Sequence, residues 1–242
     1  MQAGTQDRWI LVPGTLCTHE VFTPLLDALG VATENRTFVE ADLPKVEDYA
    51  PRLLEASPDG AIVCGFSLGS LILAHNLQAV KQARALVLLA ANPFPDPIGN
   101  RAKREAVRDR ILGGGARDWI FVNWSAMAVD QSEDLQNFVA SMAEKTVPSI
   151  AAQTELAISR PGADADLEQS DLPILFVTGA EDQLTPPDPL IPIAEAARHA
   201  RREVLSGLGH FALLEAPKRV AGCIVNGLKD LRVQSSAVEA YT

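Results

Sequence analysis

Short apolar runs alternate with amphipathic stretches along most of the chain. Strands that alternate with helices are typical of a parallel sheet covered by helices on both faces. The pattern therefore predicts an α/β protein with a mostly parallel sheet of about six strands flanked by helices. The expected strands lie near residues 9–12, 36–40, 61–64, 85–90, 173–178 and 202–205, and the expected helices near 20–29, 46–56, 68–80, 189–199 and 217–231.

A long helix-like segment interrupts this alternation. Three prolines, Pro93, Pro95 and Pro97, open the segment, and a run of glycines at 113–115 divides it. Both features break helices into short pieces. We therefore expect a helical insertion after the fifth strand-like segment. The division that follows is a core of residues 1–91 and 171–242 with an insertion at 92–170.

The apolar run at 61–64 leads directly into Gly65-Phe66-Ser67-Leu68-Gly69, in front of a helix-like stretch. A serine in this pattern sits on a sharp, strained turn between a strand and a helix, with its hydroxyl exposed. The flanking glycines let neighbouring segments pass close to the turn. The motif marks Ser67 as a candidate covalent nucleophile, although a turn without a catalytic role can have the same sequence.

Two further polar positions follow later strand-like runs. Asp182, with Glu181 beside it, lies in the turn after 173–178, and His210 lies on a glycine-flanked loop after the run near 202–205. A serine nucleophile needs a base, and the base needs a group that orients it. A lone loop histidine commonly has no such role, but the order serine, acid, histidine is the one expected for this kind of turn. We predict that Ser67, Asp182 and His210 form a catalytic triad.

Together these segments resemble the α/β-hydrolase superfamily over nearly all of the 242 residues. The resemblance is carried by 10–16, by the motif at 65–69, by the turn at 179–186 and by 207–217. It implies that the insertion is a helical cap, and it selects Asp182 over Glu181 as the acid. It also implies a serine carboxylesterase that works through an acyl-enzyme intermediate.

The resemblance implies an oxyanion hole made of two backbone N–H groups, those of Leu68 and of Thr15, with Leu16 as an alternative to Thr15. The chain has Pro13-Gly14 where many relatives have His-Gly. This departure keeps the backbone donor but changes the hydrogen bonding behind it. Larger relatives also begin with an antiparallel hairpin, which we expect to be absent or reduced here.

Large apolar side chains of the cap, among them Met127 and Phe138, have a default role in the cap's own core, because a helix must bury one face. We expect one or two of them to line a substrate pocket instead. The candidate pocket residues are Leu16, Trp119, Phe121, Trp124, Leu184 and Phe211.

Several functions fit these residues. Cleavage of a small-molecule carboxylic ester is the first. In size and cap position the chain also resembles the esterases that demethylate pimeloyl-acyl-carrier protein in biotin synthesis. A basic stripe of Arg101, Arg104 and Arg108 could dock an acidic acyl carrier protein, or it could be an ordinary solvated helix face with internal ion pairs. A C–C hydrolase or lyase, and a ligand-binding module that keeps the triad, stay open.

Composition limits the binding partners and the cellular location that we expect. A net charge of −10 disfavours nucleic acids and anionic membranes as partners. The longest apolar run, 85–91, is too short to span a membrane. Cys17, Cys64 and Cys223 suggest neither a disulfide framework nor a metal site, so we expect no cofactor and a cytoplasmic location.

Overall fold

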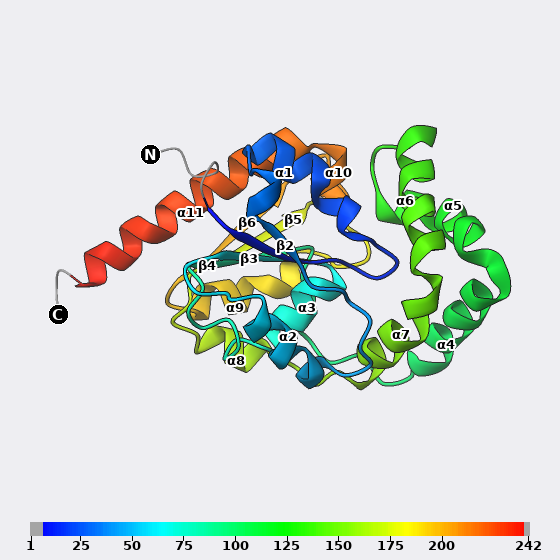
Figure 1. Cartoon of the computed structure of the whole chain (residues 1–242), viewed down its shortest axis with the longest axis horizontal. Helices are drawn as coiled ribbons and strands as arrows, with labels where there is room; N and C mark the ends of the chain where they lie inside the picture. The colour runs from blue at the N-terminus through cyan, green and yellow to red at the C-terminus, as the bar shows by residue number, and fades with distance from the viewer. Residues whose placement is uncertain (1–6, 240–242) are drawn as a thin grey trace.

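Six parallel strands form one sheet in the computed structural model, which describes residues 7–239. The order of the strands is β2-β1-β3-β4-β5-β6 (Figure 1). Their register places Gly65 beside Val12 on one side and beside Leu88 on the other. The α/β prediction is confirmed, and every strand pairing is parallel. The bounds are β1 (Trp9–Val12), β2 (Arg36–Phe38), β3 (Ile62–Phe66), β4 (Ala85–Leu89), β5 (Ile174–Gly179) and β6 (Ala200–Leu205).

Helices cover both faces of the sheet. One face carries α1 (Thr23–Leu29), α10 (Ala212–Glu215) and α11 (Pro217–Glu239), and the other carries α2 (Ala50–Glu55), α3 (Leu68–Ala74), α8 (Asp164–Glu168) and α9 (Ile191–Ala196) (Figure 1). A further group lies beyond the carboxyl ends of the strands: α4 (Arg101–Arg110), α5 (Ala116–Met127), α6 (Glu133–Thr146) and α7 (Ile150–Ser159). Short 3-10 turns lie at 19–22, 33–35, 46–49, 147–149 and 188–190, and a π-type turn at 111–115 joins α4 to α5.

The apolar character of the four inner strands, β1, β3, β4 and β5, follows from burial on both faces. In β1, Trp9 and Leu11 belong to the cluster under α1 and α11, whereas Ile10 and Val12 belong to the cluster over α2 and α3. Successive side chains of a strand point to opposite faces, so a strand buried on both sides needs an unbroken apolar run. This explains why the runs were visible in the sequence.

The helix expected at 68–80 is shorter than predicted. Helix α3 ends at Ala74, because the side chain of Asn76 donates a hydrogen bond to the carbonyl oxygen of Ile72 at 2.8 Å. In a continuing α-helix that oxygen would accept from the backbone N–H of Asn76, which bonds to Leu73 instead at 3.0 Å. The Asn76 side chain also donates to the carbonyl oxygen of Val46.

The place of the cap segment in the chain corrects our expectation. Helices α4–α7 lie between β4 and β5, not after a fifth strand. Four strands, β1 to β4, precede these helices, and they lie at the four apolar runs expected before residue 92. Helix α8 also falls within 92–170, yet it packs against α3 and α9 on one face of the sheet. Over the described residues, the structure contains no helix with the length and apolar character needed to cross a membrane.

Candidate active site

Ser67 lies at the junction of β3 and α3 in strained backbone, with φ 50° and ψ −112°. Such a conformation costs on the order of 1–3 kcal/mol in a residue with a side chain, so the surroundings must hold it. The backbone N–H of Ser67 donates to the carbonyl oxygen of Leu89 on the neighbouring strand at 2.9 Å. The hydroxyl of buried Ser70 lies 2.8 Å from the carbonyl oxygens of both Gly65 and Leu89.

Two glycines make this turn possible. A Cβ atom at Gly65 would lie 2.5 Å from the backbone nitrogen of Ser70, and one at Gly69 would lie 1.9 Å from the carbonyl oxygen of Val12. Both distances are far below van der Waals contact. The first turn of α3 therefore packs directly on β1 and β3. This is the close approach that the Gly-x-Ser-x-Gly motif predicts.

His210 and Asp182 meet Ser67 from the loops after β6 and β5. His210 Nε2 is 3.0 Å from Ser67 Oγ, and His210 Nδ1 is 2.9 Å from Asp182 Oδ2. Asp182 Oδ1 accepts the backbone N–H groups of Leu184 and Thr185, and the Thr185 hydroxyl donates to Oδ2 at 2.6 Å. The carboxylate is thus fixed by donors from its own loop while it contacts the imidazole.

The environment of Asp182 favours its ionised form. Burial alone would raise the pKa of this carboxyl group, but the charge and hydrogen bond of His210 and the hydrogen bonds of Thr185 outweigh burial and lower the pKa below its usual value. An ionised carboxylate can hold the proton of Nδ1 and stabilise an imidazolium. Asp182 therefore meets the electrostatic requirement for orienting His210 as a base.

Helix α5 supports the loop that carries His210. The backbone N–H of His210 donates to the carbonyl oxygen of Met127, the last residue of α5, at 2.8 Å. Glu215 accepts the N–H of Gly209 with one carboxylate oxygen and that of Val129 with the other, at 2.9 and 2.7 Å. Sequence reasoning treated Met127 only as an apolar side chain, because a carbonyl contact leaves no mark in the residue type.

Glu181 and Asp182, the neighbouring carboxylates of the turn at 179–186, contact different groups. Glu181 accepts the backbone N–H of Leu208 at 2.9 Å, whereas Asp182 contacts the imidazole of His210. Thr185 was missed by sequence reasoning. A threonine three residues after an aspartate is a signal for a local hydrogen-bonded turn, and this could have indicated its contact with the Asp182 carboxylate.

The candidate oxyanion loop follows β1. Cys17 N–H donates to Gly14 O at 3.2 Å and closes a tight turn that contains exposed Thr15 and, at φ 57°, Leu16. The N–H of Leu16 is not free: it donates to Oε1 of Gln153 on α7 at 3.1 Å. Sequence reasoning did not single out Gln153, although a glutamine among apolar residues of a helix is a signal of a buried polar contact.

The predicted pocket residues fall into two groups. Trp124 is buried, its ring stacks on Phe211 with centroids 5.7 Å apart, and Phe211 in turn contacts Phe66 and His210. Leu16 is buried and Trp119 is partly buried in the same apolar cluster. Phe121 and Leu184 are exposed instead, at 39% and 44% of their surface.

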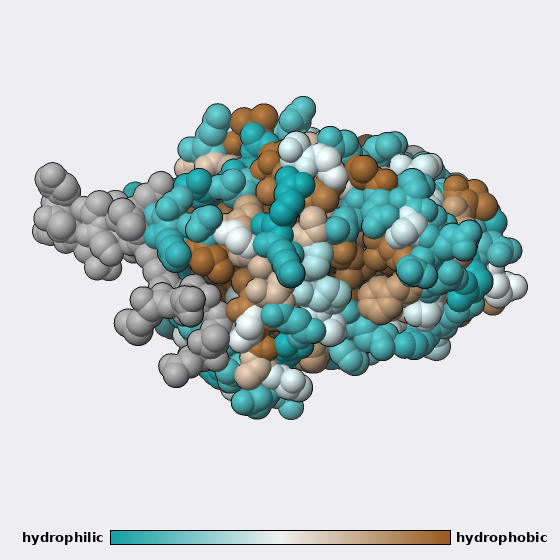
Figure 2. All heavy atoms as spheres, turned by 90° about the horizontal axis from the view of Figure 1, so that it is seen from above, coloured by the Kyte–Doolittle hydropathy of each residue, from teal (hydrophilic) through white to brown (hydrophobic). Residues whose placement is uncertain are grey.

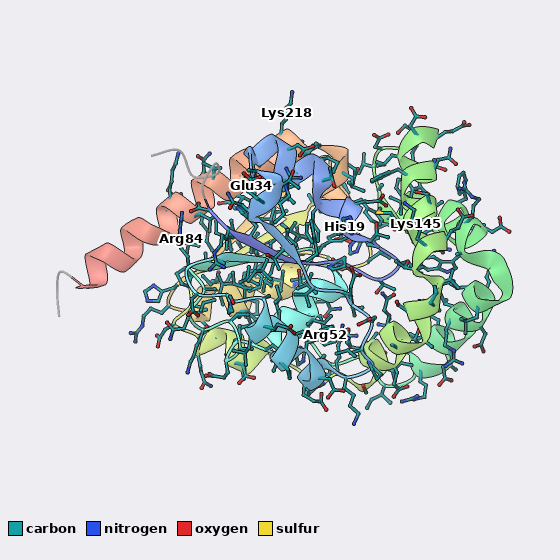
Figure 3. The ribbon with its side chains drawn as sticks, in the orientation of Figure 1. His19, Glu34, Arg52, Arg84, Lys145 and Lys218 are labelled. Atoms are coloured by element: carbon teal, nitrogen blue, oxygen red, sulfur yellow. The ribbon has the colours of Figure 1, made fainter. Side chains whose placement is uncertain are left out.

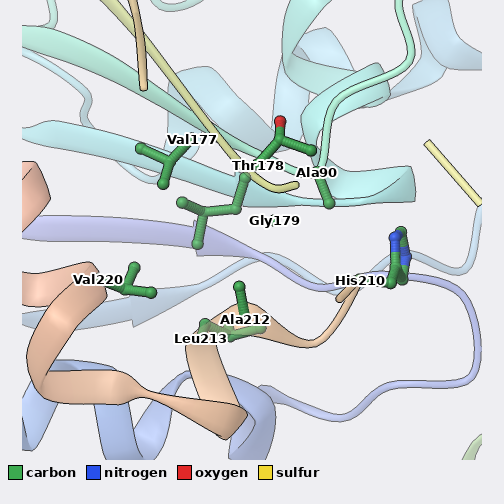
Figure 4. Close-up of a pocket in the computed structure, with 9 residues that line it drawn as sticks. Ala90, Val177, Thr178, Gly179, His210, Ala212, Leu213 and Val220 are labelled. Atoms are coloured by element: carbon green, nitrogen blue, oxygen red, sulfur yellow. The ribbon is translucent and has the colours of Figure 1, made fainter. Parts of the chain in front are cut away.

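One cavity borders His210, and a second is lined by none of Ser67, Asp182 and His210. Behind the imidazole, side chains including Val177, Ala212 and Leu213 surround about 10 Å³, room for about one water molecule (Figure 4). A larger space of about 350 Å³ is lined by residues that include His19 and Lys145, both labelled in Figure 3. Lys145 donates to Glu20 there at 2.8 Å. Seen from above, hydrophobic side chains gather between the core and the cap segment (Figure 2).

A bound metal ion or a cysteine thiol could also supply chemistry at a site of this kind. Among the residues the structure describes, no three His, Cys, Asp or Glu side chains gather as they would around a metal ion. Cys17 lies next to the candidate oxyanion loop, but burial raises the pKa of its thiol to about 12. A thiol of this kind is a poor nucleophile because it stays protonated.

Comparisons with known proteins show the family and the fold. The sequence pattern of the alpha/beta hydrolase family matches residues 9–222. A pimeloyl-[acyl-carrier protein] methyl ester esterase of Xanthomonas campestris pv. campestris is 26% identical over 88% of this chain and 91% of its own length. A thermophilic esterase from Thermogutta terrifontis superposes with a TM-score of 0.79 at 17% identity, over 95% of this chain and 92% of its own. An esterase from Exiguobacterium antarcticum superposes with a TM-score of 0.76 at 15% identity, over 93% of each chain. The chain belongs to the alpha/beta hydrolase family.

Proposed function

We propose that the protein is a serine hydrolase that cleaves a carboxylic ester through an acyl-enzyme intermediate. The observation that carries this proposal is the continuous contact from Ser67 Oγ to His210 Nε2, at 3.0 Å, and from His210 Nδ1 to Asp182 Oδ2, at 2.9 Å. A nucleophile within hydrogen-bond reach of a base, and a base oriented by a third group, are what acyl transfer by serine requires.

In the first half-reaction Ser67 Oγ attacks the acyl carbon while His210 Nε2 takes the hydroxyl proton. The carbonyl electron pair moves onto oxygen, and the backbone N–H groups of Leu68 and Thr15 stabilise the charge. When the intermediate collapses, the bond to the alcohol oxygen breaks and His210 returns its proton to that oxygen. The products are a free alcohol and an ester of Ser67.

In the second half-reaction water replaces the alcohol. His210 takes a proton from the water as its oxygen attacks the acyl carbon, and the same two N–H groups hold the oxyanion. Collapse releases the carboxylic acid and restores the Ser67 hydroxyl. Because imidazolium cannot accept a proton, this cycle requires neutral His210 at the start of each half-reaction.

The cap segment, 92–170, has a defined place in this proposal. Its helices α4–α7 lie beyond the carboxyl ends of the strands (Figure 1). Ser67, Asp182 and His210 follow the carboxyl ends of β3, β5 and β6. The hydrogen bond from His210 N–H to Met127 at the end of α5 supports a direct role for the cap segment in holding the base.

Replacing Ser67 with alanine tests the function directly. The substitution removes one hydroxyl that packs little, so we expect the fold to persist and turnover of a p-nitrophenyl ester to fall roughly a thousandfold or more. Steady-state kinetics and circular dichroism of the purified variant are the measurements. A folded variant that keeps more than a tenth of wild-type activity would exclude Ser67 as the nucleophile.

The lowered pKa of Asp182 makes a prediction about acid stability. A carboxyl group whose pKa is lower in the folded state stabilises the fold above its unfolded pKa of about 3.9, and this contribution disappears as the pH falls through the folded value. Asp182→Asn should therefore be less stable than wild type at neutral pH, with a difference that shrinks below about pH 4. Urea unfolding from pH 3 to 7 measures it, and a difference that stays constant would contradict the lowered pKa of Asp182.

A second candidate is demethylation of pimeloyl-acyl-carrier protein. It is favoured by the Xanthomonas relative, whose match covers 88% of this chain. The basic stripe on α4 bears on this candidate. Arg104 binds Asp96 through two nitrogens, and Arg101 and Arg108 pair with Glu105 and Asp109. These arginines are engaged within the protein, so their charge is partly neutralised.

Lys103 and Arg110 are better candidates for carrier contacts, because both are exposed and their spacing of seven residues places them on one face of α4. If the substrate is carrier-bound, reversing both charges should slow its hydrolysis severalfold at low salt and less at high salt. Hydrolysis of a p-nitrophenyl ester should not change. If variant and wild type hydrolysed both substrates equally fast, the carrier-bound substrate would be excluded. Cleavage of a small-molecule carboxylic ester would then remain.

A further inference from the structure

Gln153 is a buried polar residue that joins α7 of the cap segment to the core. Its side chain is 2% exposed. Oε1 accepts the backbone N–H of Leu16 at 3.1 Å, and Nε2 donates to the carbonyl oxygen of Ala41 at 2.8 Å. The amide uses one acceptor and one donor, so it bridges the loop after β1 and the loop after β2.

The loop after β1 needs such a contact. Leu16 has φ 57°, a left-handed conformation that a leucine rarely adopts, in a turn closed by the bond from Cys17 N–H to Gly14 O. The turn also contains Thr15, whose N–H lies in the peptide plane just before the one that carries the Leu16 N–H. A hydrogen bond on the Leu16 N–H fixes the peptide plane between these two residues.

The Gln153 bridge and the loop that carries His210 (the histidine loop) lie on opposite sides of Ser67. In the sheet order β2-β1-β3-β4-β5-β6, the bridge lies at β1 and β2, on one side of Ser67, whereas Asp182 and His210 follow β5 and β6 on the other side. Helix α5 contacts the histidine loop through Met127, and α7 contacts the oxyanion loop through Gln153. Each half of the site is thus tied to a different helix of the cap segment.

We propose that Gln153 is a positioning residue for the oxyanion hole. By holding the Leu16 N–H, it fixes the turn that aims the Thr15 N–H at the acyl oxygen, and it reserves Thr15 and Leu68 as the two donors. Packing of α7 on the core is thereby coupled to stabilisation of the oxyanion. This inference rests on the proposed esterase function, but the contact itself can be tested without turnover.

Two variants separate positioning from simple packing. Gln153→Leu removes the donor and the acceptor at similar volume, and Gln153→Glu keeps an acceptor but sets a carboxylate against the Ala41 carbonyl oxygen. Thr154→Val is the matched control, because Thr154 is also buried on α7, at 7%, and the change leaves both Gln153 contacts in place. The activities of all three variants are compared under conditions in which the same fraction of each protein is folded.

We expect Gln153→Leu to lower kcat roughly tenfold to a hundredfold with little change in KM, as displacement of a transition-state donor does.

The kcat of Gln153→Glu should recover toward that of wild type at acidic pH. A protonated carboxyl group again offers one donor and one acceptor, and burial favours protonation. The ratio of its kcat to that of wild type should rise as the pH falls, because the ratio removes any pH effect that both enzymes have in common. Thr154→Val should match wild type.

Hydrogen–deuterium exchange of residues 14–17 provides the readout that is independent of activity. The inference predicts faster exchange there in Gln153→Leu than in Thr154→Val. Unchanged exchange would overturn the bridge, and faster exchange with unchanged kcat would overturn its role in positioning. If wild type hydrolysed no ester at all, the proposed function would fail, whereas the exchange result would still decide whether Gln153 holds the turn.

Discussion

The backbone of Ser67 is the constraint around which the site is arranged. Its φ of 50° is maintained because β3 lies between β1 and β4 and α3 packs directly on the strands through Gly65 and Gly69. The hydrogen bond to Leu89 fixes the turn to β4. In a parallel sheet all carboxyl ends lie at one edge, so the loops after β1, β5 and β6 reach Ser67 without long excursions. The strained turn therefore determines where the other groups must lie.

The sequence predicted the sheet well for a physical reason. Strands buried on both faces, such as β5, are unbroken apolar runs. The residues that follow the strands, such as Asp182 and His210, can be assigned to one edge from the order of elements alone. The place of the cap segment was wrong by one strand: it follows β4, although the apolar runs before residue 92 already number four. The end of α3 was also missed, since the side chain of Asn76 competes with the backbone for Ile72.

Contacts between distant segments were beyond sequence reasoning. Gln153 and Leu16 are 137 residues apart, and no local pattern links them. The acceptor for His210 N–H is the carbonyl oxygen of Met127, which any residue type could provide. Each such hydrogen bond is worth about 0.5–1.5 kcal/mol, yet together they make the cap segment part of the site. Trp124, whose ring stacks on Phe211 beside the base, adds apolar contact to the same connection.

The central claim is that Ser67 attacks the acyl carbon. A fluorophosphonate tests it most directly, because the adduct imitates the tetrahedral intermediate and does not hydrolyse as an acyl-enzyme does. Intact mass spectrometry followed by peptide mapping should find one phosphonyl group per chain, on Ser67, with ester hydrolysis lost in proportion. Labelling at another residue, or full hydrolytic activity in protein that carries no adduct after prolonged exposure, would contradict the claim.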